Sequence, residues 1–312
     1  MRKRYIGIDL GGTNIKGAVV NEQGEIIRQS TCPTHAEQGA EAVTATIADM
    51  IRDLAKGEDI AGVGLGCPGT VDDNCGTVVY ACNLGWINYD VRSALKKMTG
   101  FSVRLVNDAN AAALAEVVAG AAKGAQSAVM VTLGTGVGGG IVIEGQLLHG
   151  AHGSGAELGH MVLNRDETAV CGCGKRGCVE QYCSASGIVR MAKLALEASD
   201  EESSLRSLDK MTCKDIFDAG RAGDKLALAV LDQYYAYMGE FLANVCNVVN
   251  PEVVVLGGGV SKAGTVLLDG LRPYFHKYVF HAAANVEFAL AALGNDAGAY
   301  GAFKLALDAY TK

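Results

Sequence analysis

Short apolar runs separated by glycine-containing turns open the chain. Residues 4–9 and 15–20 are mostly apolar and flank a turn at residues 10–13. A second turn, at residues 23–24, precedes another candidate strand at residues 25–31. Apolar runs of this length, bounded by turn residues, are typical of strands joined in hairpins. The pattern therefore predicts that three antiparallel strands begin the protein.

A helical pattern follows in residues 40–54. Its apolar residues Val43, Ile47, Ile51 and Leu54 recur every three or four positions, which places them on one face of a helix. The rest of the chain alternates between candidate strands and helices, as α/β proteins do. The predicted strands are residues 60–65, 102–106, 129–133, 139–143 and 252–256, and the predicted helices are residues 90–98, 109–122 and 297–310, with mostly helices between residues 184 and 249.

The opening pattern returns 123 residues later. Residues 6–13 (IGIDLGGT) align with residues 129–136 (VMVTLGTG), and in both segments a strand runs into a glycine turn and a second strand. Two explanations are open: a duplicated core whose halves face each other across a cleft, or the chance recurrence of a common strand–glycine–strand unit. We favour duplication, and expect one domain at residues 1–117 and 296–312 and a second domain at residues 118–295.

Residues 124–143 carry no charge over twenty positions, which is about the length of a membrane-spanning helix. The segment also contains six glycines and several polar residues. Because glycine is unfavourable inside a helix, we expect two buried strands joined by a glycine turn.

Composition narrows the class of protein. The 312 residues are 49% hydrophobic and 20% charged, which is enough to bury a core and excludes a disordered chain. Glycine is frequent, with 41 residues against 4 prolines, so many tight turns are expected and a collagen-like chain is excluded. The net charge of −7 argues against a nucleic-acid partner and against an anionic membrane surface.

The ten cysteines could indicate a disulfide framework or reduced thiols. Disulfide-rich proteins are short, secreted and poor in core, whereas this chain is long. In addition, Asp9 interrupts the first apolar run, which therefore does not resemble a signal peptide. We expect a cytoplasmic protein with reduced thiols, some of which bind metal.

Three glycine-rich turns follow predicted strands. In the first (DLGGT, from Asp9 to Thr13), the glycines let backbone N–H groups approach an anion, Thr13 adds a hydroxyl group, and Lys16 adds a positive charge. Asp9, at the strand end, suits a hydrated Mg²⁺ ion next to phosphates. A simple hairpin with a structural aspartate is the alternative. The second turn (residues 133–140) and the third (residues 256–261) are weak signals singly, but the three together predict phosphate binding.

Asn107 and Asp108 follow the strand predicted at residues 102–106. A carboxylate at the carboxyl end of a strand lies where open α/β sheets bind their ligands. The same position also suits a helix N-cap, and from these residues alone the cap is the preferred interpretation of Asp108.

The most specific group of potential metal ligands consists of His160, Cys171, Cys173 and Cys178. Three thiols lie within eight residues, and the glycines between them let the loop fold around an ion. One imidazole and three thiolates make a closed tetrahedral zinc site of the structural kind. Cys183 is an alternative ligand, and free thiols in a loop are the alternative to metal binding.

Several motifs, taken in order, resemble those of the ROK family of repressors, open reading frames and kinases. They are Asp-x-Gly-Gly-Thr at 9–13, Asn-Asp at 107–108, Gly-Thr-Gly-x-Gly at 134–138, Glu-x-Gly-His at 157–160, Cys-x-Cys-Gly-x-x-Gly-Cys-x-Glu at 171–180 and Gly-Gly-Gly at 257–259. The resemblance spans nearly the whole chain, and residues 184–190 (SASGIVR) look most like the bacterial glucokinases of that family.

The resemblance implies an actin-like, ribonuclease-H-like ATPase fold, which is an α/β fold with two domains flanking a cleft for sugar and ATP. It also implies transfer of a phosphoryl group from ATP to the 6-hydroxyl group of a hexose, with glucose as the expected substrate and Asp108 as the general base. The implied hexose ligands are Gly69, Asn83, Asn107, Asp108, Glu157, His160 and Glu180. The implied ligands of ATP and Mg²⁺ are Asp9, Gly11, Gly12, Thr13, Gly134, Thr135, Gly136, Gly258 and Gly259. The implied zinc ligands are His160, Cys171, Cys173 and Cys178.

Other members of the same family, and proteins outside it, supply the alternatives. N-acetylmannosamine, fructose, allose and mannose are alternative substrates, and polyphosphate is an alternative phosphoryl donor. The family's sugar-responsive repressors carry an additional DNA-binding segment before the first motif, for which Asp9 leaves no room, so a repressor is disfavoured. An actin-like filament protein or a chaperone ATPase would share the glycine turns but not the cysteine loop. The resemblance also implies a homodimer or a homotetramer.

Overall fold

The computed structural model describes residues 3–151 and 153–310. The chain divides into two compact units. Unit 1 consists of Met1–Gln126, Gly140–Ala156 and Ala292–Lys312, and unit 2 consists of Ser127–Gly139 and Glu157–Ala291. Each unit therefore combines segments that are distant in the sequence.

Unit 1 is built on a five-stranded sheet. Its strands are β1 (Arg4–Leu10), β2 (Asn14–Asn21), β3 (Ile26–Pro33), β4 (Ile60–Cys67) and β8 (Val103–Asn107), in the order β3-β2-β1-β4-β8. β2 is antiparallel to both β1 and β3, as predicted. β4 is parallel to both β1 and β8. β4 extends two residues beyond its predicted end, because Gly66 and Cys67 pair with Val106 and Asn107. The carboxyl ends of three parallel strands therefore meet at one edge of the sheet.

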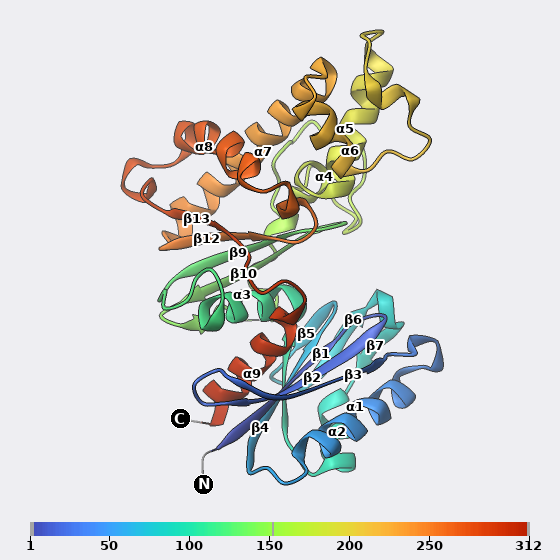
Figure 1. The fold of residues 1–312 in the computed structure, drawn as a ribbon, viewed down its shortest axis with the longest axis vertical. Helices are drawn as coiled ribbons and strands as arrows, with labels where there is room; N and C mark the ends of the chain where they lie inside the picture. The colour runs from blue at the N-terminus through green and yellow to red at the C-terminus, as the bar shows by residue number, and fades with distance from the viewer. Residues whose placement is uncertain (1–2, 152, 311–312) are drawn as a thin grey trace. The chain divides into compact units, whose positions relative to one another are not determined.

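Helices cover both faces of this sheet (Figure 1). α1 (Ala40–Ala55) and α2 (Val91–Thr99) pack on one face, and α9 (Ala297–Tyr310) packs on the other beside α3 (Asp108–Ala119). Alternate residues of β1 show the cause, since Ile8 belongs to the core formed with α1, whereas Tyr5 packs against Phe303 of α9. A Cβ atom on Gly7 would lie 2.1 Å from Ala299 O, so the glycine lets α9 approach the strand closely.

α3 ends at Ala119, three residues earlier than predicted, where the buried side chain of Glu116 folds back over the turn. Its carboxylate accepts a hydrogen bond from Ala121 N–H at 2.7 Å. It also accepts hydrogen bonds from Ala292 N–H at 3.0 Å and from Leu293 N–H at 3.1 Å. One carboxylate therefore fixes both the end of α3 and the segment where the chain re-enters unit 1.

Unit 1 also holds a three-stranded sheet that the sequence pattern did not predict. It consists of β5 (Thr70–Asp72), β6 (Thr77–Ala81) and β7 (Trp86–Tyr89), with the 3₁₀-helix η2 (Cys82–Leu84) between the last two. The strands are short, and the cross-strand pair Tyr80–Ile87 is 52% and 70% exposed. In β6 the two exposed residues Val79 and Tyr80 lie side by side between the buried Val78 and Ala81, so the strict alternation that predicts a strand is missing.

A second five-stranded sheet has the order β11-β10-β9-β12-β13. Its strands are β9 (Ala128–Leu133), β10 (Val137–Ile143), β11 (Gln146–Leu147), β12 (Val253–Gly257) and β13 (Glu287–Leu290). β12 is parallel to both β9 and β13, just as β4 is parallel to both β1 and β8. The two sheets share one topology with β9 in the place of β1, which is the correspondence expected from the sequence repeat.

The uncharged segment at residues 124–143 contains β9 and β10, as expected. Among residues 3–151 and 153–310, no helix is long and apolar enough to cross a membrane.

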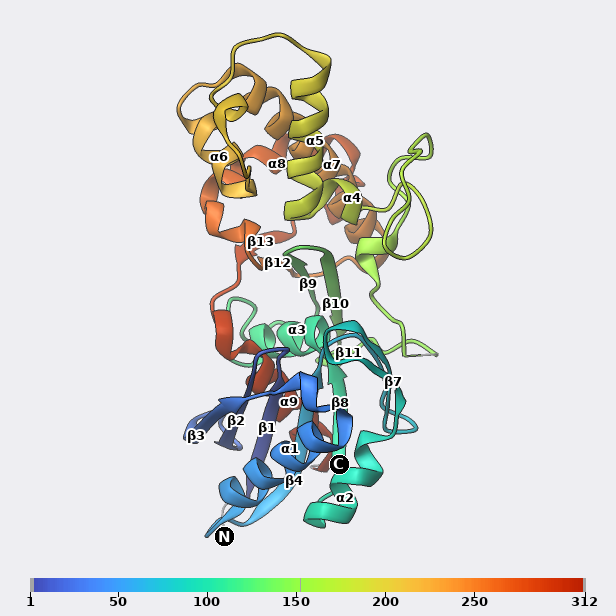
Figure 2. The ribbon, with the colours of Figure 1, turned by 90° about the vertical axis from the view of Figure 1, so that its right-hand side faces the viewer.

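The helices of unit 2 gather on one side of β12 and β13 (Figure 2). They are α4 (Glu180–Cys183), α5 (Ala185–Ala198), α6 (Cys213–Arg221), α7 (Lys225–Val249) and α8 (Thr265–Tyr278). Three of them begin after a polar N-cap residue, Ser184, Thr212 or Asp224, whose side chain accepts a hydrogen bond from a backbone N–H of the first turn. These caps set where α5, α6 and α7 begin.

Candidate active site and metal centre

The parallel strands of unit 1 bring two aspartates to one sheet edge. Asp9 pairs with Gly66 in the register of β1 and β4, and Asn107, the neighbour of Asp108, pairs with Cys67 in the register of β4 and β8. Asp9 and Asp108 lie close enough that the negative charge of Asp108 raises the pKa of Asp9. Two carboxylates from distant parts of the sequence therefore share one site.

Asp108 occupies the first position of α3. Its Oδ1 accepts hydrogen bonds from Ala109 N–H at 2.8 Å and from Asn107 Nδ2 at 3.0 Å. The preference for Asp108 as the N-cap is wrong, because Asn107 has the extended backbone of a cap and its side chain accepts from Asn110 N–H. Asn107 Nδ2 also donates to Gly69 O at 3.1 Å. Three of the expected hexose ligands, Gly69, Asn107 and Asp108, are therefore neighbours.

Partial desolvation raises the pKa of both aspartates. The pKa of Asp9 rises to about 6, chiefly because the side chain is desolvated. Lys16, which lies opposite Asp9 on β2, lowers the pKa of Asp9, whereas the charge of Asp108 raises it further. The pKa of Asp108 is raised by desolvation, and its hydrogen bond from Ala109 N–H opposes that rise. Carboxylates in this condition take up a proton or a cation more readily than exposed ones.

The first glycine turn joins β1 to β2. Thr34 Oγ1 donates a hydrogen bond of 2.6 Å to Gly11 O and so anchors the turn. Gly12 and Thr13 are exposed at its tip. A Cβ atom on Gly12 would lie 3.7 Å from Asn83 Cβ, so Asn83 lies beside this turn.

The second glycine turn joins β9 to β10. Gly134 N–H donates to Gly136 O at 3.0 Å, which closes a tight turn with Thr135 exposed at its tip. The backbone N–H groups near such a turn are accessible to an anionic ligand.

The third glycine turn follows β12 and lies against the end of β9. Gly258 has a φ of +84°, and a Cβ atom there would lie 2.5 Å from Leu133 O. Gly259 is the N-cap of the 3₁₀-helix η5 (Val260–Ala263), so the turn leads into η5 rather than directly into an α-helix. The parallel register of β9 and β12 therefore brings the second and third turns together.

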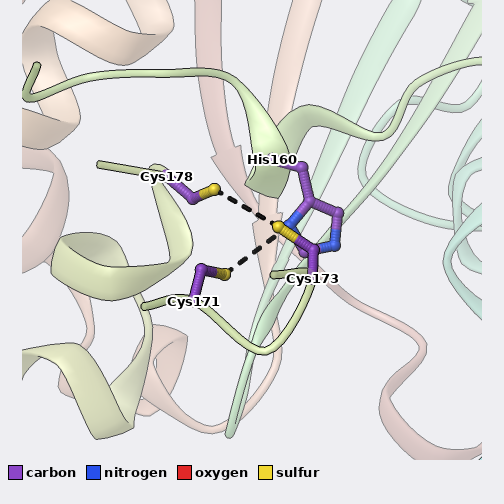
Figure 3. A group of neighbouring side chains, drawn as sticks. All are labelled: His160, Cys171, Cys173 and Cys178. Carbon is purple, nitrogen blue, oxygen red and sulfur yellow. Dashed lines mark hydrogen bonds between the residues drawn. The ribbon is translucent and has the colours of Figure 1, made fainter. Parts of the chain in front are cut away.

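His160, Cys171, Cys173 and Cys178 point toward one another in unit 2 (Figure 3). One ligand atom from each lies within 4.8 Å of those of the other three. Cys173 Sγ lies 3.6 Å from Cys178 Sγ, and Cys171 Sγ lies 4.0 Å from His160 Nδ1. The ligand atoms of a tetrahedral zinc site, with Zn–S of about 2.3 Å and Zn–N of about 2.0 Å, lie about 3.5–3.8 Å apart. The predicted cluster is confirmed, and its donors and spacing fit zinc.

Backbone hydrogen bonds shape the cysteine loop. Cys171 N–H donates to Lys175 O at 2.7 Å, and Gly174 N–H donates to Cys171 O at 2.8 Å. Val179 N–H donates to Met161 O at 2.9 Å, which joins the loop to the residue that follows η3 (Leu158–His160). The imidazole and the thiols therefore come from two segments that are fixed to each other.

The thiols of the cluster differ in acidity. Burial raises the pKa of Cys171, and it raises the pKa of Cys178 to about 12. A hydrogen bond from Lys175 N–H lowers the pKa of Cys173. Cys183, the alternative ligand, is buried in α4 and is not part of the cluster that the described residues form.

Two glutamates that were expected to bind hexose flank the metal cluster. Glu157 is exposed just before η3, and its carbonyl oxygen accepts a hydrogen bond from His160 N–H at 3.1 Å. Glu180 is the first residue of α4, and its Oε2 accepts from Val137 N–H at 3.0 Å. Its Oε1 lies 3.7 Å from Cys171 Sγ. Glu180 therefore contacts both the metal cluster and the second glycine turn.

Two residues near these groups were not predicted from the sequence. Ala156, just before Glu157, has a φ of +63°, a left-handed conformation that costs a non-glycine residue roughly 1–2 kcal/mol. Such strain tends to occur at functional sites. Asn110 is 8% exposed, and its Oδ1 has no hydrogen-bond partner within the described chain. It lines a cavity of about 120 Å³ together with Asn107. Neither the backbone angle nor the unpaired oxygen has a counterpart in the sequence pattern.

The expected ligands are divided between the two units. Unit 1 contains Asp9, Gly11, Gly12, Thr13, Lys16, Gly69, Asn83, Asn107 and Asp108. Unit 2 contains Gly134, Thr135, Gly136, Glu157, His160, Glu180, Gly258 and Gly259 together with the three cysteines of the cluster.

Comparison with known proteins gives consistent matches over almost the whole chain. The family model described as "ROK family" matches residues 5–309. A glucokinase of Halalkalibacterium halodurans is 41% identical over 306 residues, which cover 95% of this chain and 93% of that protein. The structure of a ROK hexokinase from Thermus thermophilus has a TM-score of 0.87 at 33% identity and covers 99% of this chain and 100% of that one. The structure of a ROK family glucokinase from Streptomyces griseus in complex with glucose and AMPPNP has a TM-score of 0.76 at 35% identity, with 98% and 99% covered.

Proposed function

The chain belongs to the ROK family, and from this premise we propose that it is a kinase that phosphorylates a hexose at the 6-hydroxyl group with ATP. Glucose is the preferred substrate in this proposal, which the 41% identity to a glucokinase supports. The structural observation that carries the proposal is the carboxylate of Asp108, which is held beside Asn107 and Gly69 and has a raised pKa.

Asp108 acts as the general base. Its carboxylate accepts the proton of the 6-hydroxyl group while the hydroxyl oxygen forms a bond to the γ-phosphorus. The bond between the γ-phosphorus and the bridging oxygen breaks, and ADP leaves. The two hydrogen bonds to Oδ1 fix the orientation of the carboxylate, and the raised pKa makes it a better proton acceptor than an aspartate of ordinary pKa.

Polar side chains bind the hexose in this proposal. A sugar presents many hydroxyl groups, and each one left unpaired on burial costs about 1–3 kcal/mol, so the ligands must satisfy them individually. Carboxylate, amide and imidazole groups can do so because they offer acceptors and donors at fixed positions. The proposed ligands are Gly69, Asn83, Asn107, Asp108, Glu157, His160 and Glu180.

The glycine turns bind the nucleotide. The backbone N–H groups of the first and second turns contact the phosphates, and Gly258 and Gly259 contact the adenosine. Desolvation and the charge of Asp108 make the ionised form of Asp9 unfavourable, and a divalent cation would neutralise that charge. Asp9 is therefore the proposed site for hydrated Mg²⁺, and Lys16, Gly11, Gly12, Thr13, Gly134, Thr135 and Gly136 complete the set.

The metal cluster has a structural role in this proposal. Zinc bound to His160, Cys171, Cys173 and Cys178 would supply a cross-link between two loop segments, because four protein ligands leave no open position for catalysis. The ring nitrogen of His160 that does not face the cysteines remains available for a sugar hydroxyl group.

A coupled assay of ADP release with a panel of sugars tests the proposal. The panel contains glucose, mannose, fructose, allose and N-acetylmannosamine, with ATP or polyphosphate as donor. We expect the highest kcat/KM for glucose with ATP. A different preferred sugar would correct the substrate alone, whereas the absence of phosphorylation with every sugar and donor would overturn the assignment as a hexose kinase.

A further inference from the structure

The side chain of Glu180 lies between two parts of unit 2 that have different expected ligands. Oε2 accepts a hydrogen bond of 3.0 Å from Val137 N–H, at the end of the second glycine turn. Oε1 lies 3.7 Å from Cys171 Sγ, a member of the metal cluster. The two oxygens of one carboxylate therefore join the cluster to the turn.

The carboxylate occupies this position because residue 136 is a glycine. A Cβ atom on Gly136 would lie 2.3 Å from Glu180 Oε2 and 3.1 Å from Glu180 Cδ. Any larger residue at this position would force the carboxylate away from Val137 N–H. The backbone of the turn is thus shaped to receive Glu180.

Two further contacts attach the same turn to the segments that carry the cluster. A Cβ atom on Gly159, next to His160, would lie 2.1 Å from Val137 O, so η3 packs directly against the turn. Ala185 N–H, which follows α4, donates to Gly134 O at 2.9 Å. Segments on both sides of the metal cluster therefore support residues 134–137.

We propose that Glu180 is a positioning residue that couples the metal cluster to the second glycine turn, so that metal binding strengthens nucleotide binding. This inference rests on the proposed function, in which that turn binds the phosphates of ATP. A metal ion that fixes Cys178 also fixes the start of α4, where Glu180 lies two residues further along the chain, and the Glu180 carboxylate in turn orders Val137 N–H. Because coupling between two binding equilibria is reciprocal, bound nucleotide must raise metal affinity by the same factor.

Hydrogen exchange tests the coupling without any substrate. We expect a peptide spanning residues 134–140 to exchange at least about fivefold faster in metal-free protein than in zinc-loaded protein. The Glu180→Ala variant, loaded with zinc, should show the same faster exchange. Equal exchange of this peptide in all three proteins would overturn the coupling.

Binding measurements separate positioning from hexose recognition. The affinities to measure by calorimetry are those for Mg²⁺-AMPPNP and, separately, for glucose. We expect Glu180→Ala to raise the Kd for nucleotide about tenfold, as the loss of a hydrogen bond to a charged group does. Glu180→Gln keeps an acceptor oxygen for Val137 N–H, so its nucleotide Kd should stay within about threefold of the original value while its glucose Kd rises.

Glu157→Ala is the matched control, since it removes another expected hexose ligand that has no hydrogen bond to the turn among the described residues. It should raise the glucose Kd and leave the nucleotide Kd unchanged. If Glu180→Ala behaves like Glu157→Ala, Glu180 is a hexose ligand alone and the coupling is refuted. If the unmodified protein fails to bind either glucose or Mg²⁺-AMPPNP, the proposed function fails instead.

Discussion

Replacing Asp9 by asparagine should stabilise the protein while it removes the proposed Mg²⁺ ligand. Asp9 packs against the first turn of α9, where a Cβ atom on Gly298 would lie 2.2 Å from Asp9 Cγ. Desolvation at this position raises the pKa of Asp9 from 3.8 to about 6. A raised pKa means that the folded protein prefers the neutral acid, so the charged form lowers stability at neutral pH.

The magnitude follows from the difference between the two pKa values. Since a pKa difference of one corresponds to 1.36 kcal/mol, a change from 3.8 to about 6 corresponds to about 3 kcal/mol. This cost is absent below pH 3.8, grows as the pH rises, and reaches its full value above about pH 6. Asparagine imitates the neutral acid, so Asp9→Asn should raise the free energy of unfolding by about 3 kcal/mol at pH 7.5 and by about half as much at pH 5.

Urea denaturation followed by tryptophan fluorescence measures the effect. Trp86 is the single tryptophan, is 2% exposed, and lies in unit 1 with Asp9, so its emission reports the unfolding of this unit. The measurement is made between pH 5 and pH 8 without Mg²⁺ or nucleotide. Asp59→Asn, at an exposed loop position of the same unit, is the matched control and should change stability by less than about 0.5 kcal/mol.

Two results would contradict the reasoning on Asp9. One is an Asp9→Asn variant that is no more stable than the original protein at pH 7.5. The other is a gain in stability that does not depend on pH, which would assign the effect to packing rather than to charge.

Three other substitutions test separate parts of the structure. Asp108→Ala should lower kcat by about a thousandfold and leave glucose binding within about threefold, and substantial remaining turnover would refute the general base. Cys173→Ala should abolish zinc binding in a metal assay, lower the free energy of unfolding by about 2 kcal/mol or more, and weaken glucose binding; an unchanged melting temperature and KM would refute the structural role of the cluster. Glu116→Gln should destabilise unit 1 by about 3 kcal/mol in the same fluorescence assay, because an amide cannot accept from Ala121, Ala292 and Leu293 together, and a loss below about 1 kcal/mol would show that these N–H groups find other partners.

Much of the fold could be predicted because burial follows a regular period in the sequence. The helix at residues 40–54 and the strands at its two sides each have one face in the same core, so their apolar positions recur with the period of the element. The repeat of residues 6–13 at residues 129–136 also predicted the shared topology of the two sheets. The metal cluster could be predicted because its cysteines are close in sequence and their chemistry is specific.

The remaining features depend on contacts that leave no periodic trace. The small sheet could not be predicted because exposed pairs such as Tyr80–Ile87 interrupt the alternation of buried and exposed residues. The N-cap of α3 could not be assigned to Asn107 or to Asp108 without the backbone angles. The carboxylates of Glu116 and Glu180 accept hydrogen bonds from backbone N–H groups far away in the sequence. Any residue can supply such an N–H, so the sequence carries no sign of these pairings.

The position of α9 has a consequence for the synthesis of the protein. α9 ends two residues before the last residue of the chain, yet it covers one face of β1, where Tyr5 and Phe303 meet with ring centroids 5.9 Å apart. A ribosome makes β1 before unit 2 and α9 after it, so a nascent chain has already produced all of unit 2 before unit 1 can be completed. Chains that terminate early therefore expose the apolar face of β1, and we expect them to depend on chaperones or to be degraded.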